Sequence, residues 1–94
     1  MRVLVVEDDR HLASGLKRGL EAEGFEAHLA HDGSDGLLRG QTEHFDVIIL
    51  DIMLPGLNGY LVCDCLRKAG VWTPILMLTA KDGEYDEAEA LDTG

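Results

Sequence analysis

Four side chains that could do chemistry stand directly after apolar segments of this chain. Glu7 and Asp8 follow the first apolar run, Asp51 follows the third, and Thr79 follows the fourth. In open parallel sheets, ligands bind outside the carboxyl ends of the strands. If these segments are neighbouring parallel strands, three carboxylates and one hydroxyl meet at the same edge of the sheet.

Three carboxylates held close together repel one another, and a bound cation relieves that repulsion. Oxygen ligands suit Mg²⁺, which proteins hold through one or two carboxylates together with water and phosphate oxygens. A carboxylate beside such a metal can attack a phosphorus centre and form an acyl phosphate. Asp51 is the better nucleophile candidate, because it ends the most apolar strand and precedes a turn containing Pro55. We expect Asp8, and Glu7 through water, to hold the metal, with the Thr79 hydroxyl donating to a phosphoryl oxygen.

Each of these residues also has a purely structural interpretation. Asp8 is equally suited to capping a helix and to binding a metal, whereas we expect Asp9 to be a cap. A threonine at the end of a strand, such as Thr79, commonly has only a structural role. Asp51 is harder to explain in this way, because a lone buried carboxylate is costly. The prediction of a site therefore rests on the whole group of residues.

The elements that must position these residues alternate along the chain between strands and helices. Apolar runs predict strands, and apolar residues at helical spacing predict amphipathic helices. Such alternation is typical of a parallel sheet with right-handed crossovers and helices on both faces. Glycines at 33, 36 and 40 make the second helix the least secure element. The predicted strands are Val3–Val6, Phe25–Ala30, Val47–Leu50 and Ile75–Leu78, and the predicted helices are Arg10–Glu23, Asp32–Leu38, Tyr60–Gly70 and Glu84–Leu91.

Composition narrows the classes of function that the chain can have. Its formal net charge of -10 argues against direct contact with nucleic acid, which requires clustered Lys and Arg. Cys63 and Cys65 form neither a CxxC pair nor a zinc ligand set, and we interpret them as packing thiols in a reducing compartment. We find no signal peptide and no apolar run of membrane-spanning length, and therefore expect a cytoplasmic protein.

Three stretches of the chain resemble the response-regulator receiver domain of bacterial two-component signalling. They are VLVVEDD at residues 3–9, DVIILDIMLPG at residues 46–56 followed by Gly59, and TPILMLTA at residues 73–80. The similarity runs through the whole chain in order. The acidic pair, the turn and the final Leu-Thr-Ala are most similar to the subfamily whose receivers precede a winged-helix DNA-binding domain.

The resemblance implies a role for each of the site residues. Asp51 would accept a phosphoryl group from a sensor histidine kinase. Asp8, Asp51 and the backbone carbonyl of Met53 would bind Mg²⁺, and Glu7 would assist through water. Thr79 would be the switch residue. Met53 and Lys81 would modulate how water reaches the acyl phosphate.

The resemblance also implies a flavodoxin-like (CheY-like) doubly wound α/β fold with strand order 2-1-3-4. We expect residues 1–94 to form one receiver domain that is C-terminally incomplete, with the fifth strand and helix of the family absent. The family's Lys before a Pro and its aromatic switch residue would be missing, since Lys81 is only two positions past Thr79. The fourth strand, Ile75–Leu78, would become an exposed edge. We therefore expect a homo-oligomer, formed through this edge or through a swapped element.

Two other classes of function remain open from the residues. One is a phosphatase that forms an aspartyl phosphate, but such enzymes usually carry a second acid two residues after the nucleophile, where this chain has Met53. The other is an interaction module that is not phosphorylated. The leading interpretation is a phospho-accepting signalling domain, and not an enzyme that acts on external substrates.

Overall fold

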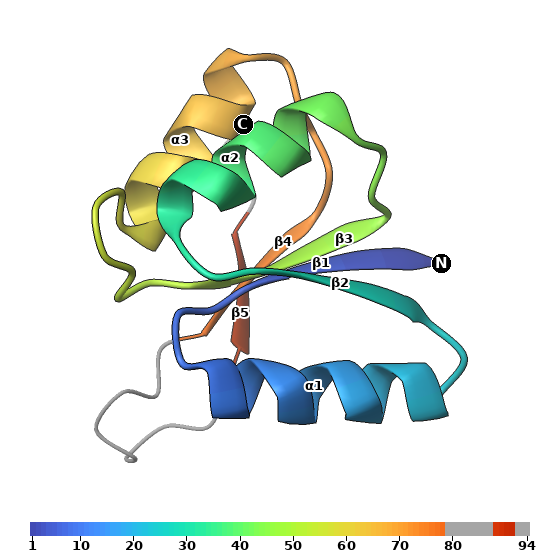
Figure 1. Ribbon diagram of the computed structural model, residues 1–94. Coiled ribbons are helices and arrows are strands. Elements are labelled where there is room, and N and C mark those ends of the chain that lie inside the picture. Colours follow the sequence, from blue (N-terminus) through green and yellow to red (C-terminus); the bar gives the residue numbers. More distant parts are fainter. Residues whose placement is uncertain (79–87, 92–94) are drawn as a thin grey trace.

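The computed structural model describes residues 1–78 and the backbone of residues 88–91 (Figure 1). Within these residues, a five-stranded sheet lies between one helix on one face and two helices on the other. The strands are β1 (Arg2–Val6), β2 (Glu26–Ala30), β3 (Val47–Asp51), β4 (Ile75–Leu78) and β5 (Ala88–Leu91), and the helices are α1 (Arg10–Ala22), α2 (Gly33–Thr42) and α3 (Gly59–Lys68).

The sheet has the order β2-β1-β3-β4-β5, and its first four strands are parallel. This confirms the predicted α/β class and the predicted order 2-1-3-4. β1 lies between β2 and β3 and pairs with both of them along its length. Val6 lies opposite Leu50 in the register between β1 and β3. Glu7, which follows Val6, and Asp51, which follows Leu50, therefore lie level with each other at the edge of the sheet.

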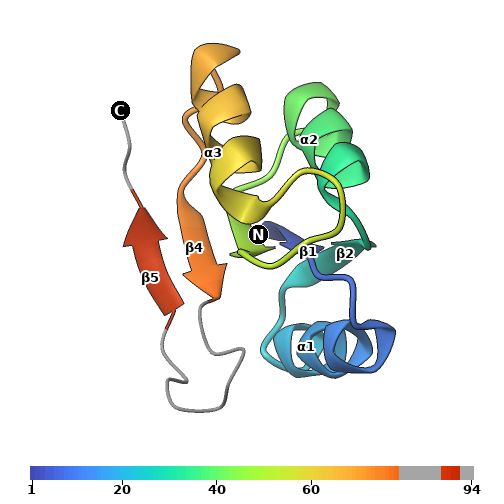
Figure 2. The ribbon, with the colours of Figure 1, turned by 90° about the vertical axis from the view of Figure 1, so that its left-hand side faces the viewer.

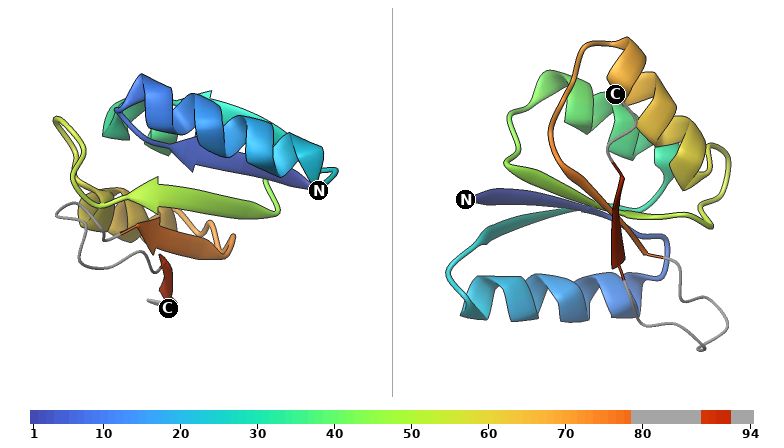
Figure 3. Two further views of the ribbon diagram at one scale, coloured as in Figure 1. Left: turned by 90° about the horizontal axis from the view of Figure 1, so that it is seen from below. Right: turned by 180° about the vertical axis from the view of Figure 1, so that it is seen from behind.

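The two faces of the sheet are covered differently (Figure 3). Seen from below, α1 lies over β1 and β2, while α2 and α3 lie side by side on the opposite face. The main core fills the space between the sheet and the α2–α3 pair, because alternate strand residues point to that side. Its members are Leu4, Val6, Ala30, Phe45, Ile48, Leu50, Leu54, Val62, Cys63, Leu66, Ile75 and Met77.

α2 forms despite the low helix propensity of its glycines, because those glycines are its contact surface. All three are buried. A Cβ at Gly36 would lie 2.7 Å from a Val6 methyl group, and one at Gly40 would lie 3.0 Å from a Leu66 methyl group. Glycine thus lets the helix backbone approach β1 and α3 more closely than any other residue would. The helix extends to Thr42, beyond the predicted end at Leu38.

The predicted helix Glu84–Leu91 is wrong for its last four residues. Ala88–Leu91 form β5, which pairs antiparallel with β4 (Figure 2). Residues 79–87 lie outside the described residues. Glu and Ala favour helices, but pairing with β4 satisfies a row of backbone N–H and C=O groups that would otherwise form an open edge. The expectation that β4 is an exposed edge strand is therefore also wrong.

Within the described part of the chain, no helix has the length and apolar character needed to cross a membrane.

Candidate functional site

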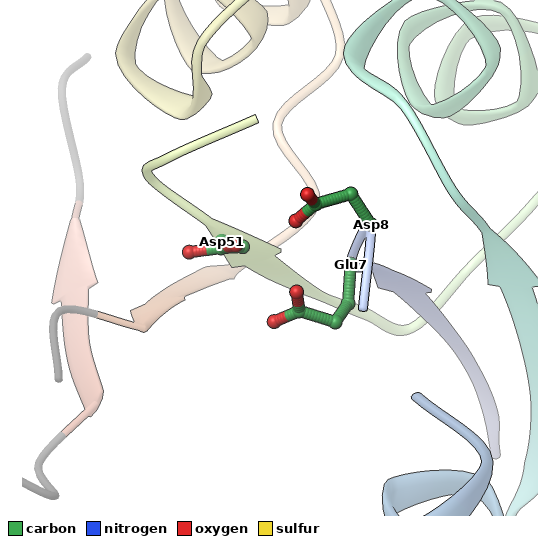
Figure 4. Close-up of side chains that lie close together, drawn as sticks. All are labelled: Glu7, Asp8 and Asp51. Atoms are coloured by element: carbon green, nitrogen blue, oxygen red, sulfur yellow. The ribbon is translucent and has the colours of Figure 1, made fainter. Parts of the chain in front are cut away.

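Three acidic side chains meet at the carboxyl edge of the sheet (Figure 4). Glu7 and Asp8 directly follow β1, and Asp51 is the last residue of β3. The parallel register brings the ends of these two strands level, so that the side chains project into the same space. One carboxylate oxygen from each residue lies within 4.8 Å of the other two. The predicted convergence of Glu7, Asp8 and Asp51 is thereby confirmed.

The three carboxylates differ in their access to solvent. Glu7 is 1% exposed and Asp51 is 0% exposed, whereas Asp8 is on the surface. Two buried acids beside a third carry a substantial cost of desolvation and repulsion. Part of that cost is offset locally, because Oε2 of Glu7 accepts a hydrogen bond from the Asp9 N–H at 3.0 Å. The site thus combines a buried floor with one acid at its mouth.

The structure assigns different roles to the neighbouring residues Asp8 and Asp9, of which the sequence left the role of Asp8 open. Oδ1 of Asp9 accepts a hydrogen bond from the Leu12 N–H at 3.1 Å and caps α1. The prediction that Asp9 is a cap is confirmed. Asp8 instead places a carboxylate oxygen with those of Glu7 and Asp51. Adjacent residues of the same type therefore have separate tasks, one in the helix and one in the acidic cluster.

The turn after β3 folds back on Asp51. The Met53 N–H donates to Oδ1 of Asp51 at 3.2 Å, which fixes the orientation of that carboxylate. The Gly59 N–H donates to the Ile52 carbonyl oxygen at 2.9 Å and ties the start of α3 to the same turn. The Met53 side chain is 63% exposed. Thr79 and Lys81, the other two predicted site residues, lie outside the described residues.

One neighbour of the site was not found from the sequence. Nδ1 of His31 lies 3.0 Å from the backbone carbonyl oxygen of Glu7. Because that oxygen can only accept, Nδ1 carries the hydrogen and donates it. His31 thereby joins the end of β2 to the end of β1, next to the acidic cluster. It belongs to no motif, and only the pairing of β2 with β1 places it there.

The donor set has the chemistry of a site for a hard cation. Its three members offer carboxylate oxygens, and neither sulfur nor imidazole takes part in the cluster. Oxygen donors of this kind suit Mg²⁺ and Ca²⁺, and a site with few protein ligands that is open to water suits Mg²⁺ better. The exposed Asp8 leaves such an opening. The residues present therefore fit the metal that the sequence predicts.

Comparison with known proteins agrees with this geometry. The family model described as the response regulator receiver domain matches residues 3–94. The chain is 43% identical over 93 residues to the alkaline phosphatase synthesis transcriptional regulatory protein PhoP of Bacillus subtilis, covering 99% of this chain and 39% of that protein. It is 45% identical over 94 residues to the transcriptional regulatory protein DltR of Streptococcus agalactiae, covering 100% of this chain and 42% of that protein. The chain thus spans about two fifths of the length of these curated relatives.

Solved structures give the same result. A receiver domain of a Francisella response regulator superposes with a TM-score of 0.82 at 36% identity, covering 88% of this chain and 69% of that one. The response regulator TrrA of Thermotoga maritima, solved in complex with Mg²⁺ and BeF, superposes with a TM-score of 0.80 at 37% identity, covering 84% of this chain and 69% of that one. With its sheet order, its acidic edge and a family match along nearly its whole length, the chain belongs to the response regulator receiver domain family.

Proposed function

We propose that this domain receives a phosphoryl group on Asp51 from a sensor histidine kinase and reports it to an output domain. The observation that carries the proposal is the meeting of the Glu7, Asp8 and Asp51 carboxylate oxygens within 4.8 Å at one edge of the sheet. Receiver domains of response regulators interact with such kinases. The relatives PhoP and DltR are transcriptional regulators, and we extend that output to the protein of which this domain is part.

The chemical step is a transfer between two nucleophiles. A carboxylate oxygen of Asp51 attacks the phosphorus of a phosphohistidine, and the phosphorus–nitrogen bond breaks. The electron pair of that bond returns to the imidazole, which takes up a proton, and Asp51 becomes a mixed acyl phosphate. The hydrogen bond from the Met53 N–H to Oδ1 holds the Asp51 carboxylate in one orientation for this attack. Such fixed orientation lowers the entropic part of the barrier.

Magnesium is the cofactor that we assign to this step. Asp8, Asp51 and the Met53 backbone carbonyl would bind it directly, and Glu7 would hold one of its waters. When bound, the metal neutralises the charge that gathers between the carboxylates and the phosphoryl oxygens. Glu7 forms part of the buried floor of the cluster, and the exposed Asp8 stands at the side from which a phosphate would arrive.

Three further roles complete the proposal. The Thr79 hydroxyl turns toward the phosphoryl group and serves as the switch. Met53 and Lys81 modulate how water reaches the acyl phosphate, and the 63% exposure of the Met53 side chain beside the site supports its part in this. The phosphorylated state then changes the surface that the output domain contacts.

We also propose that the domain acts in the cytoplasm and self-associates. Cys63 packs in the buried core, as expected for a thiol in a reducing compartment. The pairing of β5 with β4 removes the open edge that the sequence predicted, so we assign self-association to exchange of β5 between two copies. A strand that is joined to the sheet through only one neighbour can be donated to a second copy without loss of its own pairing.

The test compares the three classes of function in a single experiment. The chain is incubated with acetyl phosphate and Mg²⁺, and its intact mass is followed. Addition of one phosphoryl group, without turnover of an added phosphoester, supports the proposal. Sustained hydrolysis of the phosphoester would identify a phosphatase. The absence of any phosphoryl adduct would favour an interaction module that is not phosphorylated. Either result overturns the proposal.

A further inference from the structure

The segment from Ile52 to Asn58 contains the Met53 carbonyl of the proposed metal site. Two buried glycines, Gly33 and Gly59, contact the two ends of this segment. Gly33 is the first residue of α2, and Gly59 is the first residue of α3. The two helices pack against each other on the same face of the sheet (Figure 2). The segment is therefore enclosed where these helices begin.

At Gly33, the contact with the segment is direct and involves backbone atoms. A Cβ built on Gly33 would overlap the carbonyl oxygen of Leu57 and would lie 2.9 Å from its carbonyl carbon. Real Cβ atoms essentially never approach other atoms so closely, and a backbone carbonyl cannot rotate aside as a side chain can. Any side chain at position 33 therefore displaces either the start of α2 or the segment.

At Gly59, the corresponding contact is with the nucleophile's own backbone. A Cβ there would lie 2.5 Å from the Asp51 carbonyl oxygen and 2.8 Å from Cα of Ile52. The Gly59 N–H also donates to the Ile52 carbonyl oxygen. Gly59 thus lets α3 begin against the first peptide of the turn, while Gly33 lets α2 begin against its last residues.

From this arrangement we infer that Gly33 and Gly59 are positioning residues of the metal and phosphoryl site. Between their two contacts lies Met53, whose N–H holds Oδ1 of Asp51 and whose carbonyl is the proposed metal ligand. Contacts at both ends fix this segment relative to the acidic cluster, although neither glycine is itself a proposed metal ligand. The inference rests on the proposed function, since it assigns to the glycines the placement of that same site.

Two other helical glycines provide matched controls. Gly40 is also buried in α2, but its Cβ would meet only the ends of the flexible Leu66 and Ile48 side chains, at 3.0 and 3.6 Å. Gly19 lies in α1 with nothing within 4 Å of its Cβ. An alanine at position 40 thus tests the effect of filling the core beneath the same helix. An alanine at position 19 tests helix propensity alone.

The experiment measures the affinity of each variant for Mg²⁺ by isothermal titration calorimetry, under conditions where circular dichroism shows the variant to be folded. Gly33→Ala and Gly59→Ala should each weaken Mg²⁺ binding by about tenfold or more, as loss of a supporting contact does at other metal sites. Gly40→Ala and Gly19→Ala should bind Mg²⁺ as the unsubstituted chain does. Gly40→Ala also perturbs a buried contact and so serves as a control for lost stability. If it is destabilised as much as Gly33→Ala or Gly59→Ala but keeps its Mg²⁺ affinity, the weaker binding of those two variants comes from a misplaced site and not from a less stable fold.

Other results would overturn the inference. It fails if Gly33→Ala and Gly59→Ala keep the Mg²⁺ affinity of the unsubstituted chain, or if Gly40→Ala loses as much affinity as they do. Should a variant unfold in plain buffer, it is repeated with sucrose and with Gly19→Ala added, both of which favour the folded state. If both variants remain unfolded even then, the glycines serve the fold alone and the inference is rejected. Absence of Mg²⁺ binding by the unsubstituted chain would instead refute the proposed function itself.

Discussion

The Met53 N–H donates to Oδ1 of Asp51 across a turn of only two residues, at 3.2 Å. The last residue of β3 is thus held by the segment that leaves the sheet, and not only by the strand. The hydrogen bond orients a carboxylate that has no exposed surface of its own. The same turn contains the Met53 carbonyl that we propose as a metal ligand, and the first residues of α2 and α3 both pack closely against this turn.

Substituting Asp8 separates repulsion from metal binding. Asp8→Asn removes one of three carboxyl groups whose oxygens lie within 4.8 Å of one another. The metal-free variant should unfold a few degrees higher than the unsubstituted chain, because repulsion falls. Its Mg²⁺ affinity should fall by about tenfold or more, because a charged ligand is lost. Calorimetric melting with and without Mg²⁺ measures both effects.

Asp9→Asn is the matched control for that substitution. Asn caps helices about as well as Asp, and Asp9 caps α1 through Oδ1 without joining the acidic cluster. This variant should therefore keep both the melting temperature and the Mg²⁺ affinity. If it lost the affinity as Asp8→Asn does, the separate roles assigned to the two aspartates would be wrong.

The cap of α3 should contribute measurably to stability. The Asn58 side chain accepts a hydrogen bond from the Leu61 N–H at 3.0 Å, at the start of the helix that supports the turn after β3. Asn58→Ala should lower the free energy of unfolding by about 1 kcal/mol, whereas Asn58→Ser should keep most of it. Urea denaturation measures the difference. Equal stability of all three proteins would show that the cap is not needed.

The carboxyl groups that bind Arg2 should make the free energy of unfolding fall at acid pH. The Arg2 backbone N–H donates to Oδ2 of Asp46 at 2.7 Å, and this hydrogen bond lowers the pKa of the Asp46 carboxyl. The pKa of Glu43 is lowered as well, first by its hydrogen bond from the Arg39 guanidinium and then by that from Arg2. A carboxyl with a lowered folded-state pKa stabilises the fold fully above its unfolded pKa, and this contribution disappears as the pH falls through the folded value.

The advantage of the unsubstituted chain over Asp46→Asn should thus be constant near neutral pH. It should shrink as the pH falls below about 4, near the ordinary pKa of Asp. Urea unfolding of both proteins across this range measures the difference. An advantage that grew on acidification would contradict the sign of the pKa shift.

Much of the site could be predicted because it follows from simple geometry. Apolar runs such as Val47–Leu50 identify strands, and neighbouring parallel strands end at one edge of the sheet, so the acids at the ends of β1 and β3 meet there. Whether Asp8 caps α1 or joins the acidic cluster needed the structure. It depends on where the helix begins to within one residue, and sequence patterns do not define helix ends so closely.

The errors arose where tertiary contacts outweigh local preference. Glu84–Leu91 has a helix-forming composition, but its last four residues pair with β4, because an unpaired strand edge is satisfied by any segment within reach. α2 is the converse case. Its glycines weaken the helix in isolation, yet Gly33 and Gly36 are required by the close approach of Leu57 and Val6. A propensity scale records the cost of a glycine, but not the neighbour that requires it.

Locating the phosphoryl group tests the central claim most directly. The unsubstituted chain, Asp51→Asn and Asp9→Asn are each incubated with acetyl phosphate and Mg²⁺, and their masses are compared. We predict one phosphoryl group on the unsubstituted chain and on Asp9→Asn, its loss when Mg²⁺ is chelated, and none on Asp51→Asn. An adduct of equal yield on Asp51→Asn would show that another residue is the acceptor and would contradict the account.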